Sequence, residues 1–213
     1  MFTPRKLRIA FLLVSVAALS IGCSTPRPPQ VHVPPRMDLS RLGTLGLVDF
    51  ASEGNAGIGA LGAREFLAAL QSAQPGTPVI ELGDERRLLA ELGRETLDTE
   101  AVRALGEKYR IDALIVGTLD SQRVSPRVAF DASAAFATAK AELDGALDAR
   151  ILDTRTGATL WSTTTRARAE IAGVEISDRG IANIGTRSPD DARQRLVTRL
   201  VRKATADFWA HWE

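Results

Sequence analysis

The stretch Asp112-Ala113-Leu114-Ile115-Val116-Gly117-Thr118 decides the fold. Its apolar residues fall on both faces of an extended chain, which is typical of a strand buried in the centre of a sheet. Leu45–Phe50 has the same character and predicts a first buried strand. Helical periodicity separates the two strands, so the first half of the chain is expected to contain βαβ segments.

Helix and short-strand signals fill the interval between these strands. A helix is predicted up to about Ala73, because its apolar residues recur on one face. Residues 78–82 predict a short strand. Asp84 and Asp98 are predicted to cap the N-termini of two further helices, since their carboxylates can accept the otherwise unpaired amides of a first turn.

The second half of the sequence has an antiparallel pattern. From Ala141 to Ile151, small and apolar residues alternate with mostly charged ones, which predicts a strand with one wet face. Residues 153–157 predict a turn, and residues 160–171 predict the returning strand of a hairpin. Residues 173–187 are rich in Gly, Asp and Asn and predict a loop.

The C-terminal segment predicts a long amphipathic helix, and His211 is expected to be helical as well. Ser188–Asp191 supplies a cap, a first-turn proline and two acids that complement the helix dipole. The predicted fold class is therefore α+β. It is a mixed β-sheet with βαβ segments first and an antiparallel hairpin second, with helices packed on it, including the C-terminal one.

The N-terminus predicts a lipoprotein signal peptide over residues 1–22. Three basic residues precede an apolar run from Ile9 to Leu19, which is too short for a bilayer span of roughly 20 residues. The run ends in small residues before Cys23 and resembles the lipobox of bacterial lipoproteins. This resemblance implies that the chain is cut before Cys23 and lipidated on its sulfur. The alternatives are an uncleaved anchor or a cleaved peptide with a spare thiol.

Residues 23–42 are predicted to form a tether before a globular domain at 43–213. Five of the ten prolines lie between Pro26 and Pro35, and Pro-rich chains are extended. By resemblance to the sorting rule of many Gram-negative lipoproteins, Ser24 favours the outer membrane. The sequence therefore predicts a lipid-anchored outer-membrane protein whose domain faces the periplasm.

Composition limits the chemistry that is expected. Cys23 is the sole cysteine, and His32 and His211 lie at opposite ends of the mature chain, so neither a disulfide nor a structural zinc site is expected. Residues 1–22 hold three basic residues and no acidic ones, which leaves 24 basic and 26 acidic residues in the remainder. That balance does not suggest nucleic-acid binding.

One motif could indicate a cofactor. Gly57, Gly59 and Gly62 match the dinucleotide-binding pattern G-x-G-x-x-G, and Glu81 follows at the distance of a ribose-binding acid. However, six residues separate Phe50 from the first glycine, and the second half lacks a second mononucleotide-binding unit. Close packing of a helix on the sheet is the favoured interpretation. No cofactor, metal site or catalytic residue is predicted, and the chain is expected not to be an enzyme.

Several side chains are candidates for partner contact. Trp161, Trp209 and Trp212 could anchor a protein, since Trp is enriched at binding hot spots, although packing against the core is the simpler role. Acids on one strand face suggest either solvation or a basic partner: Glu142, Asp144 and Asp148. The basic face of the last helix suggests solvation, or contact with anionic glycans or lipid headgroups.

Three segments together resemble a known periplasmic domain: Leu45–Phe50, Leu105–Thr118 and Ala149–Ser162. The second contains Leu-Gly-x-x-Tyr-x-x-Asp, and the third contains Asp-x-x-Thr-Gly-x-x-x-Trp. They look like the domain shared by curli secretion-channel (CsgG-like) lipoproteins, LpoB-type activators of penicillin-binding proteins and the amino-terminal domain of TolB. The resemblance covers roughly residues 43–210 and implies partner binding without catalysis.

The relatives imply different functions. An LpoB-type module would bind an envelope protein in peptidoglycan-synthase regulation or cell-envelope assembly, which fits the tether and a compact domain. A CsgG-like subunit would assemble into an oligomeric secretion complex and need membrane-spanning hairpins, for which Val124–Lys140 is the candidate insert. A partner-binding lipoprotein is the leading expectation, an oligomeric secretion subunit the alternative, and a nucleotide-binding enzyme a remote one.

Overall fold

The computed structural model describes residues 31–212 except 53–55, 132–135, 178–179 and 187. The chain divides into two units, and the larger, Val33–His211, is the one discussed below. The predictions made for the signal peptide, Cys23 and Ser24 lie outside the described residues. Among the described residues, no helix has the length and apolar character needed to cross a membrane.

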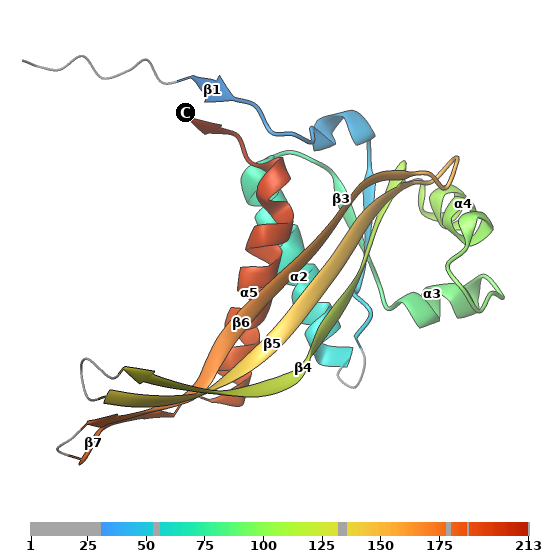
Figure 1. Cartoon of the computed structure of the whole chain (residues 1–213). Coiled ribbons are helices and arrows are strands. Elements are labelled where there is room, and N and C mark those ends of the chain that lie inside the picture. The colour runs from blue at the N-terminus through green and yellow to red at the C-terminus, as the bar shows by residue number, and fades with distance from the viewer. Residues whose placement is uncertain (1–30, 53–55, 132–135, 178–179, 187, 213) are drawn as a thin grey trace, which may run out of the picture. The chain divides into compact units, whose positions relative to one another are not determined.

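The larger unit is built on a mixed sheet, as predicted (Figure 1). Within the described residues the sheet has six strands in the order β3-β2-β4-β5-β6-β7. The central strand β2 is parallel to β3 and β4, whereas β4, β5, β6 and β7 pair antiparallel in succession. The strands are β2 (Leu45–Val48), β3 (Val79–Gly83), β4 (Ala113–Asp131), β5 (Phe136–Asp153), β6 (Thr159–Ser177) and β7 (Gly180–Thr186).

Helices cover both faces of the sheet. They are α2 (Ala56–Ala73), α3 (Glu85–Glu91), α4 (Thr99–Tyr109) and α5 (Pro189–Ala204), with 3-10 turns η1 (Leu39–Leu42) and η2 (Thr205–Phe208). In the described part of the chain, β1 (His32–Val33) and β8 (His211–Trp212) form a separate two-stranded sheet. The predicted α+β class and the long C-terminal helix are confirmed.

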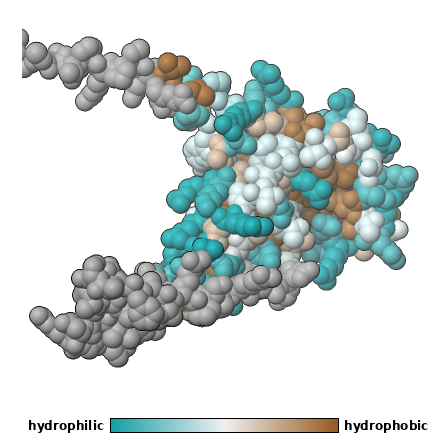
Figure 2. All heavy atoms as spheres, viewed as in Figure 1, coloured by the Kyte–Doolittle hydropathy of each residue, from teal (hydrophilic) through white to brown (hydrophobic). Residues whose placement is uncertain are grey.

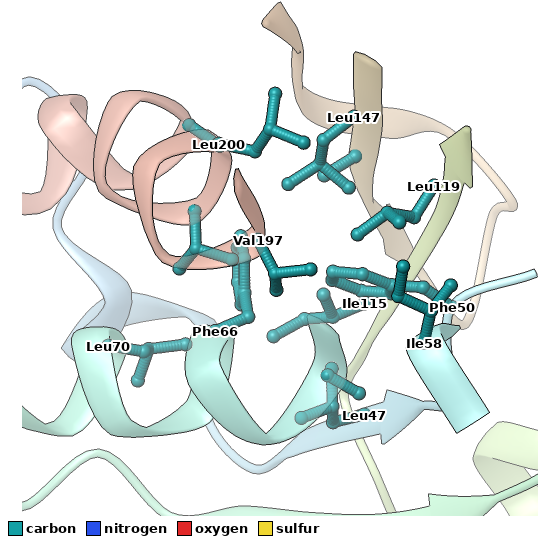
Figure 3. Close-up of a cluster of buried hydrophobic side chains, with 14 of the residues drawn as sticks. Leu47, Phe50, Ile58, Phe66, Leu70, Ile115, Leu119, Leu147, Val197 and Leu200 are labelled. Carbon is teal, nitrogen blue, oxygen red and sulfur yellow. The ribbon is translucent and has the colours of Figure 1, made fainter. Parts of the chain in front are cut away.

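Successive side chains at the start of β4 point alternately into two hydrophobic cores, one on each face of the sheet. Ala113 and Ile115 point into the core under α2 and α5, and Leu114 and Val116 point into the core under α3 and α4. Figure 3 shows the first core, where side chains from the sheet meet Phe66 of α2 and helix α5. This explains why the central strand is apolar on both faces, since each face is covered by helices.

The predicted helix caps are confirmed. The Asp84 carboxylate accepts the amide of Arg87, and the Asp98 carboxylate accepts the amide of Ala101. The Ser188 hydroxyl likewise accepts the amide of Asp190 at the start of α5. Each bond satisfies a first-turn amide that has no partner within its helix.

Two predictions of local structure were wrong. Most of the predicted loop 173–187 is strand, because β6 continues to Ser177 and β7 follows at Gly180. The segment becomes strand because β6 pairs with β5, as at Ile176 with Ala137, and β7 pairs with β6, as at Gly185 with Gly173. Local sequence does not reveal this pairing. His211, expected to be helical, lies in the short strand β8 instead.

The candidate insert 124–140 is no separate insertion. β4 and β5 pair continuously from Ala113 with Asp153 out to Asp131 with Phe136, apart from one irregularity after Asp120. Its described parts, 124–131 and 136–140, form the outer ends of β4 and β5, beside which β6 and β7 pair (Figure 1).

Packed structure begins before the predicted boundary at residue 43. Leu39 has no exposed surface, and the side-chain amide of Gln74 holds this segment against the C-terminal end of the chain. Gln74 accepts the amide of Leu39 at 2.8 Å and donates to the carbonyls of Met37 and Phe208 at 2.6 and 3.1 Å. The Met37 amide also donates to the carbonyl of Asp207 at 3.1 Å, and Arg36 pairs with the Asp207 carboxylate at 3.6 Å. Residues 36–39 are therefore joined to the segment around Phe208 both directly and through Gln74.

An ion-pair network joins α3 to α4 and gives a prediction about pH. Glu91 accepts hydrogen bonds from Lys108 at 2.7 Å and from Arg87 and Tyr109 at 3.2 Å. The Lys108 ammonium, followed by the other two donors, lowers the pKa of Glu91 from 4.5 to about 2. A carboxylate with a lowered pKa stabilises the fold above its unfolded pKa, and this contribution disappears as the pH falls towards the folded pKa.

We therefore expect Glu91→Gln to weaken the fold at neutral pH and to flatten the loss of stability between about pH 4.5 and 2. Urea unfolding midpoints measured across this pH range test the prediction. Glu107→Gln, at an exposed site on α4, is the control and should retain the wild-type pH profile. Identical profiles for Glu91→Gln and wild type would contradict it.

Candidate functional site

Gly106 and Asp112, two residues of the motif Leu-Gly-x-x-Tyr-x-x-Asp, contribute to packing between elements. Gly106 of α4 lies against Thr154, so that a Cβ there would be 2.5 Å from the Thr154 Cβ. The Thr154 hydroxyl bonds the carbonyls of Ile111 and Asp112, and the Asp112 carboxylate accepts the amide of Thr44. These contacts join α4, the start of β4 and the β5–β6 turn, so the motif residues here position the strands.

The glycine motif lies in the first turns of α2 and is filled by protein. A Cβ on Gly59 would lie 1.9 Å from the carbonyl oxygen of Phe50, and one on Gly62 would meet Leu119 and the Phe50 ring at 3.0 and 3.1 Å. Glu81 is exposed on β3. The glycines therefore allow α2 to approach the chain after β2, in agreement with the packing interpretation.

Trp161 packs into an aromatic cluster on the face of the sheet that α2 and α5 cover. Its ring centroid lies 4.8 Å from that of Phe208 and 6.4 Å from that of Phe66. Phe66 also contacts Phe50 edge-on at 5.5 Å, and the Trp161 indole donates to the Asp207 carboxylate at 3.2 Å. Trp161 is therefore engaged in intramolecular packing, the simpler of the two roles considered for it.

Trp209 is placed differently. Its side chain is 41% exposed, and it directly follows Phe208, which is completely buried. The backbone at this point is held by a bond from the Trp209 amide to the carbonyl of Ala206 and by Gln74 on the Phe208 carbonyl. Trp209 is thus a large apolar side chain exposed on a fixed base, whereas the Trp212 side chain lies outside what the structure describes.

A groove runs along β6 and α5, and we call it the β6–α5 groove. Its volume is about 870 Å³. The charged residues that line it are Arg166 and Arg168 of β6, Arg199, Arg202 and Lys203 of α5, Asp144 of β5 and Asp120 of β4. Figure 2 shows hydrophilic side chains gathered over this part of the molecule.

The groove forms because part of β6 is an edge strand. β7 pairs with β6 only from Ala172 onward, so among the described strands the preceding part of β6 has β5 as its neighbour. On its other side, Arg199 donates to the carbonyl of Arg168 at 2.6 Å and Lys203 donates to the carbonyl of Arg166 at 2.9 Å. These two side chains block strand acceptors that could otherwise pair with another chain.

Two of the acids predicted on the exposed face of β5 bond to side chains of β6. Asp144 pairs with Arg168 at 2.6 Å, and Asp148 accepts a hydrogen bond from Thr164. On α5, Arg193 pairs with Asp190 at 2.7 Å. By contrast, no described carboxylate lies within salt-bridge distance of Arg166 or Arg202, so the groove carries a surplus of positive charge.

Sequence comparison detects no known protein family and no curated relative. Solved structures similar to this chain include lipoproteins and a dodecamer. A PelC dodecamer from Paraburkholderia phytofirmans is 10% identical with a TM-score of 0.43, covering 86% of this chain and 98% of that chain.

Two others are the LpoB C-terminal domain from Salmonella enterica and lipoprotein GNA1162 from Neisseria meningitidis. Each is 15% identical with a TM-score of 0.36. The first covers 73% of this chain and 93% of that chain, and the second 76% and 96%. At such low identities, the functional argument depends on the residues of this chain itself.

Proposed function

We propose that this chain is a non-enzymatic lipoprotein of the cell envelope that binds an envelope protein. Lipidation of Cys23 would hold it at the outer membrane, because two or more acyl chains anchor stably where one does not. The domain would face the periplasm and act in envelope assembly or in regulation of a peptidoglycan synthase. The resemblance of Leu45–Phe50, Leu105–Thr118 and Ala149–Ser162 to LpoB-type activators supports this class of function.

Trp209 is the observation that carries the proposal. Truncating an interface Trp often costs 2 kcal/mol or more of binding free energy, because its large rigid surface loses water on contact. The Gln74 bond and buried Phe208 hold Trp209 before any partner arrives. Such preorganisation reduces the entropy lost on association.

The test places a photo-crosslinking residue at position 209 of the full chain in living cells. We expect one envelope protein to be captured there and not from position 160, where Leu160 is 40% exposed and serves as the matched control. Trp209→Ala should then weaken affinity for the captured protein by roughly thirtyfold, the equivalent of about 2 kcal/mol, with unchanged thermal stability. Capture of no envelope protein would refute the proposal.

An oligomeric secretion subunit is the second candidate, and one observation favours it. β2 pairs with β4 only from Ala113 to Ile115, and Ala51 adds one bridge at Thr118. In the described backbone, β4 beyond Leu119 therefore has a free edge, as does β7. Free edges pair with strands of other chains, and a heterologous pairing of β4 with β7 would build a ring or filament. Native mass of the full chain in detergent separates the candidates, since a ring would be many times the monomer.

A further inference from the structure

A second groove continues the β6–α5 groove along the helix. It measures about 430 Å³ and shares Arg199 and Arg202 with the first. Arg195 lies four residues before Arg199 and lines this second groove. At 1.5 Å per residue, the three guanidinium-bearing positions extend over roughly 10 Å of the helix axis. The cations therefore form a track longer than a single small ligand requires.

The charge on this track is available to a ligand. Arg199 and Lys203 donate to backbone carbonyls, which hold them in place without neutralising them. Arg166 and Arg202 have no carboxylate partner among the described residues. Guanidinium groups bind planar anions in a bidentate fashion, so fixed arginines in a groove favour a ligand with repeated negative groups.

We propose that the β6–α5 groove and its continuation bind an acidic polysaccharide, a linear glycan that carries a carboxylate at each repeat. Arg166 and Arg202 would bind its carboxylates. Asp120 and Asp144 also line the groove, and Asp144 already pairs with Arg168. An ionised carboxylate has about four acceptor sites, so sugar hydroxyls would donate to these aspartates beside the bonds that they already make. This ligand therefore carries anions for the arginines and places neutral hydroxyls, rather than further charges, next to the aspartates.

Other polyanions match this lining less well. An acidic peptide added as a β-strand needs the carbonyls of Arg166 and Arg168, which Lys203 and Arg199 already occupy. Single-stranded nucleic acid binds on aromatic platforms, and the described lining of both grooves has no aromatic residue. Inorganic polyphosphate carries a charge at every unit, so it would place like charges against Asp120 and Asp144.

The test measures binding of alginate oligosaccharides to the full chain in a non-ionic detergent, by calorimetry. We expect binding that weakens by about tenfold or more as salt rises from about 50 to 200 mM, since each ion pair releases counterions. Dextran oligosaccharides of equal length, which lack carboxylates, should not bind. Polyphosphate of equal charge should bind more weakly than alginate.

The discriminating variant is Arg166→Gln with Arg202→Gln, because neither side chain has a described bond to lose. It should weaken alginate binding by about tenfold or more with unchanged thermal stability. The control, Arg64→Gln with Arg86→Gln, removes the same charge from exposed sites outside the groove and should bind like wild type. Equal losses in the two variants, or polyphosphate binding as tightly as alginate, would overturn the inference. Protein capture at Trp209 is a separate readout, so this inference can fail while the proposed function stands.

Discussion

Gly59→Ala is expected to destabilise the protein by about 2–3 kcal/mol, although alanine is the better helix former by about 1 kcal/mol. Helix propensity alone therefore predicts the opposite sign. The loss arises because the new Cβ would lie 1.9 Å from the Phe50 carbonyl oxygen, so α2 must move away from the sheet. Urea unfolding of the full chain in detergent measures the change.

Ala68→Val is the matched control, since it adds carbon to an exposed position of the same helix. Its expected loss is below about 1 kcal/mol, the scale of helix propensity alone. A Gly59→Ala variant that is more stable than wild type would show that the close approach is not needed.

A ligand test on Gly59 distinguishes its role in packing from a role in nucleotide binding. If the motif bound a dinucleotide, NAD in excess would raise the melting temperature of the wild-type chain by mass action. We expect no shift, because Phe50 and Leu119 fill the space next to the glycines. A shift that Gly59→Ala abolishes would instead support the enzyme alternative.

Much of the architecture could be predicted because it depends on local signals. Asp84, Asp98 and Ser188 each begin a helix through a bond to an amide two or three residues away, and such signals are visible in the sequence. The two-sided apolar character of β4 likewise follows from its period of two, with a core on each face. These features require no knowledge of distant residues.

The rest depends on distant pairs. The outer part of β6 is a strand because β5 pairs with it, although Gly173 and the polar residues that follow indicate a loop. The basic face of α5 was evident from sequence, but the groove was not, because it needs the carbonyls of Arg166 and Arg168 on another element. Trp161 and Trp209 are also alike in sequence, and only the fold separates the partly buried ring that packs on Phe208 from the exposed one.

Phe66→Ala is expected to cost about 3–5 kcal/mol, the range for deleting a fully buried aromatic ring. Phe66 has no exposed surface and touches Phe50, Trp161 and Phe208, so its loss leaves a cavity where α2, β6 and η2 meet. Native stabilities are commonly 5–15 kcal/mol, so this single change would remove a large share of the total. Urea unfolding followed by tryptophan fluorescence measures it.

Phe66→Leu provides the control, because it keeps most of the buried volume and should lose less than half as much. A loss below about 1 kcal/mol for Phe66→Ala would mean that the cluster is not tightly packed. The cluster also supports the segment that ends in Trp209, through Phe208. Phe66→Ala should therefore reduce partner capture together with stability, whereas Trp209→Ala should reduce capture alone. If a destabilised but folded Phe66→Ala chain still captures the partner, then Trp209 does not need a rigid backbone beneath it to bind that partner.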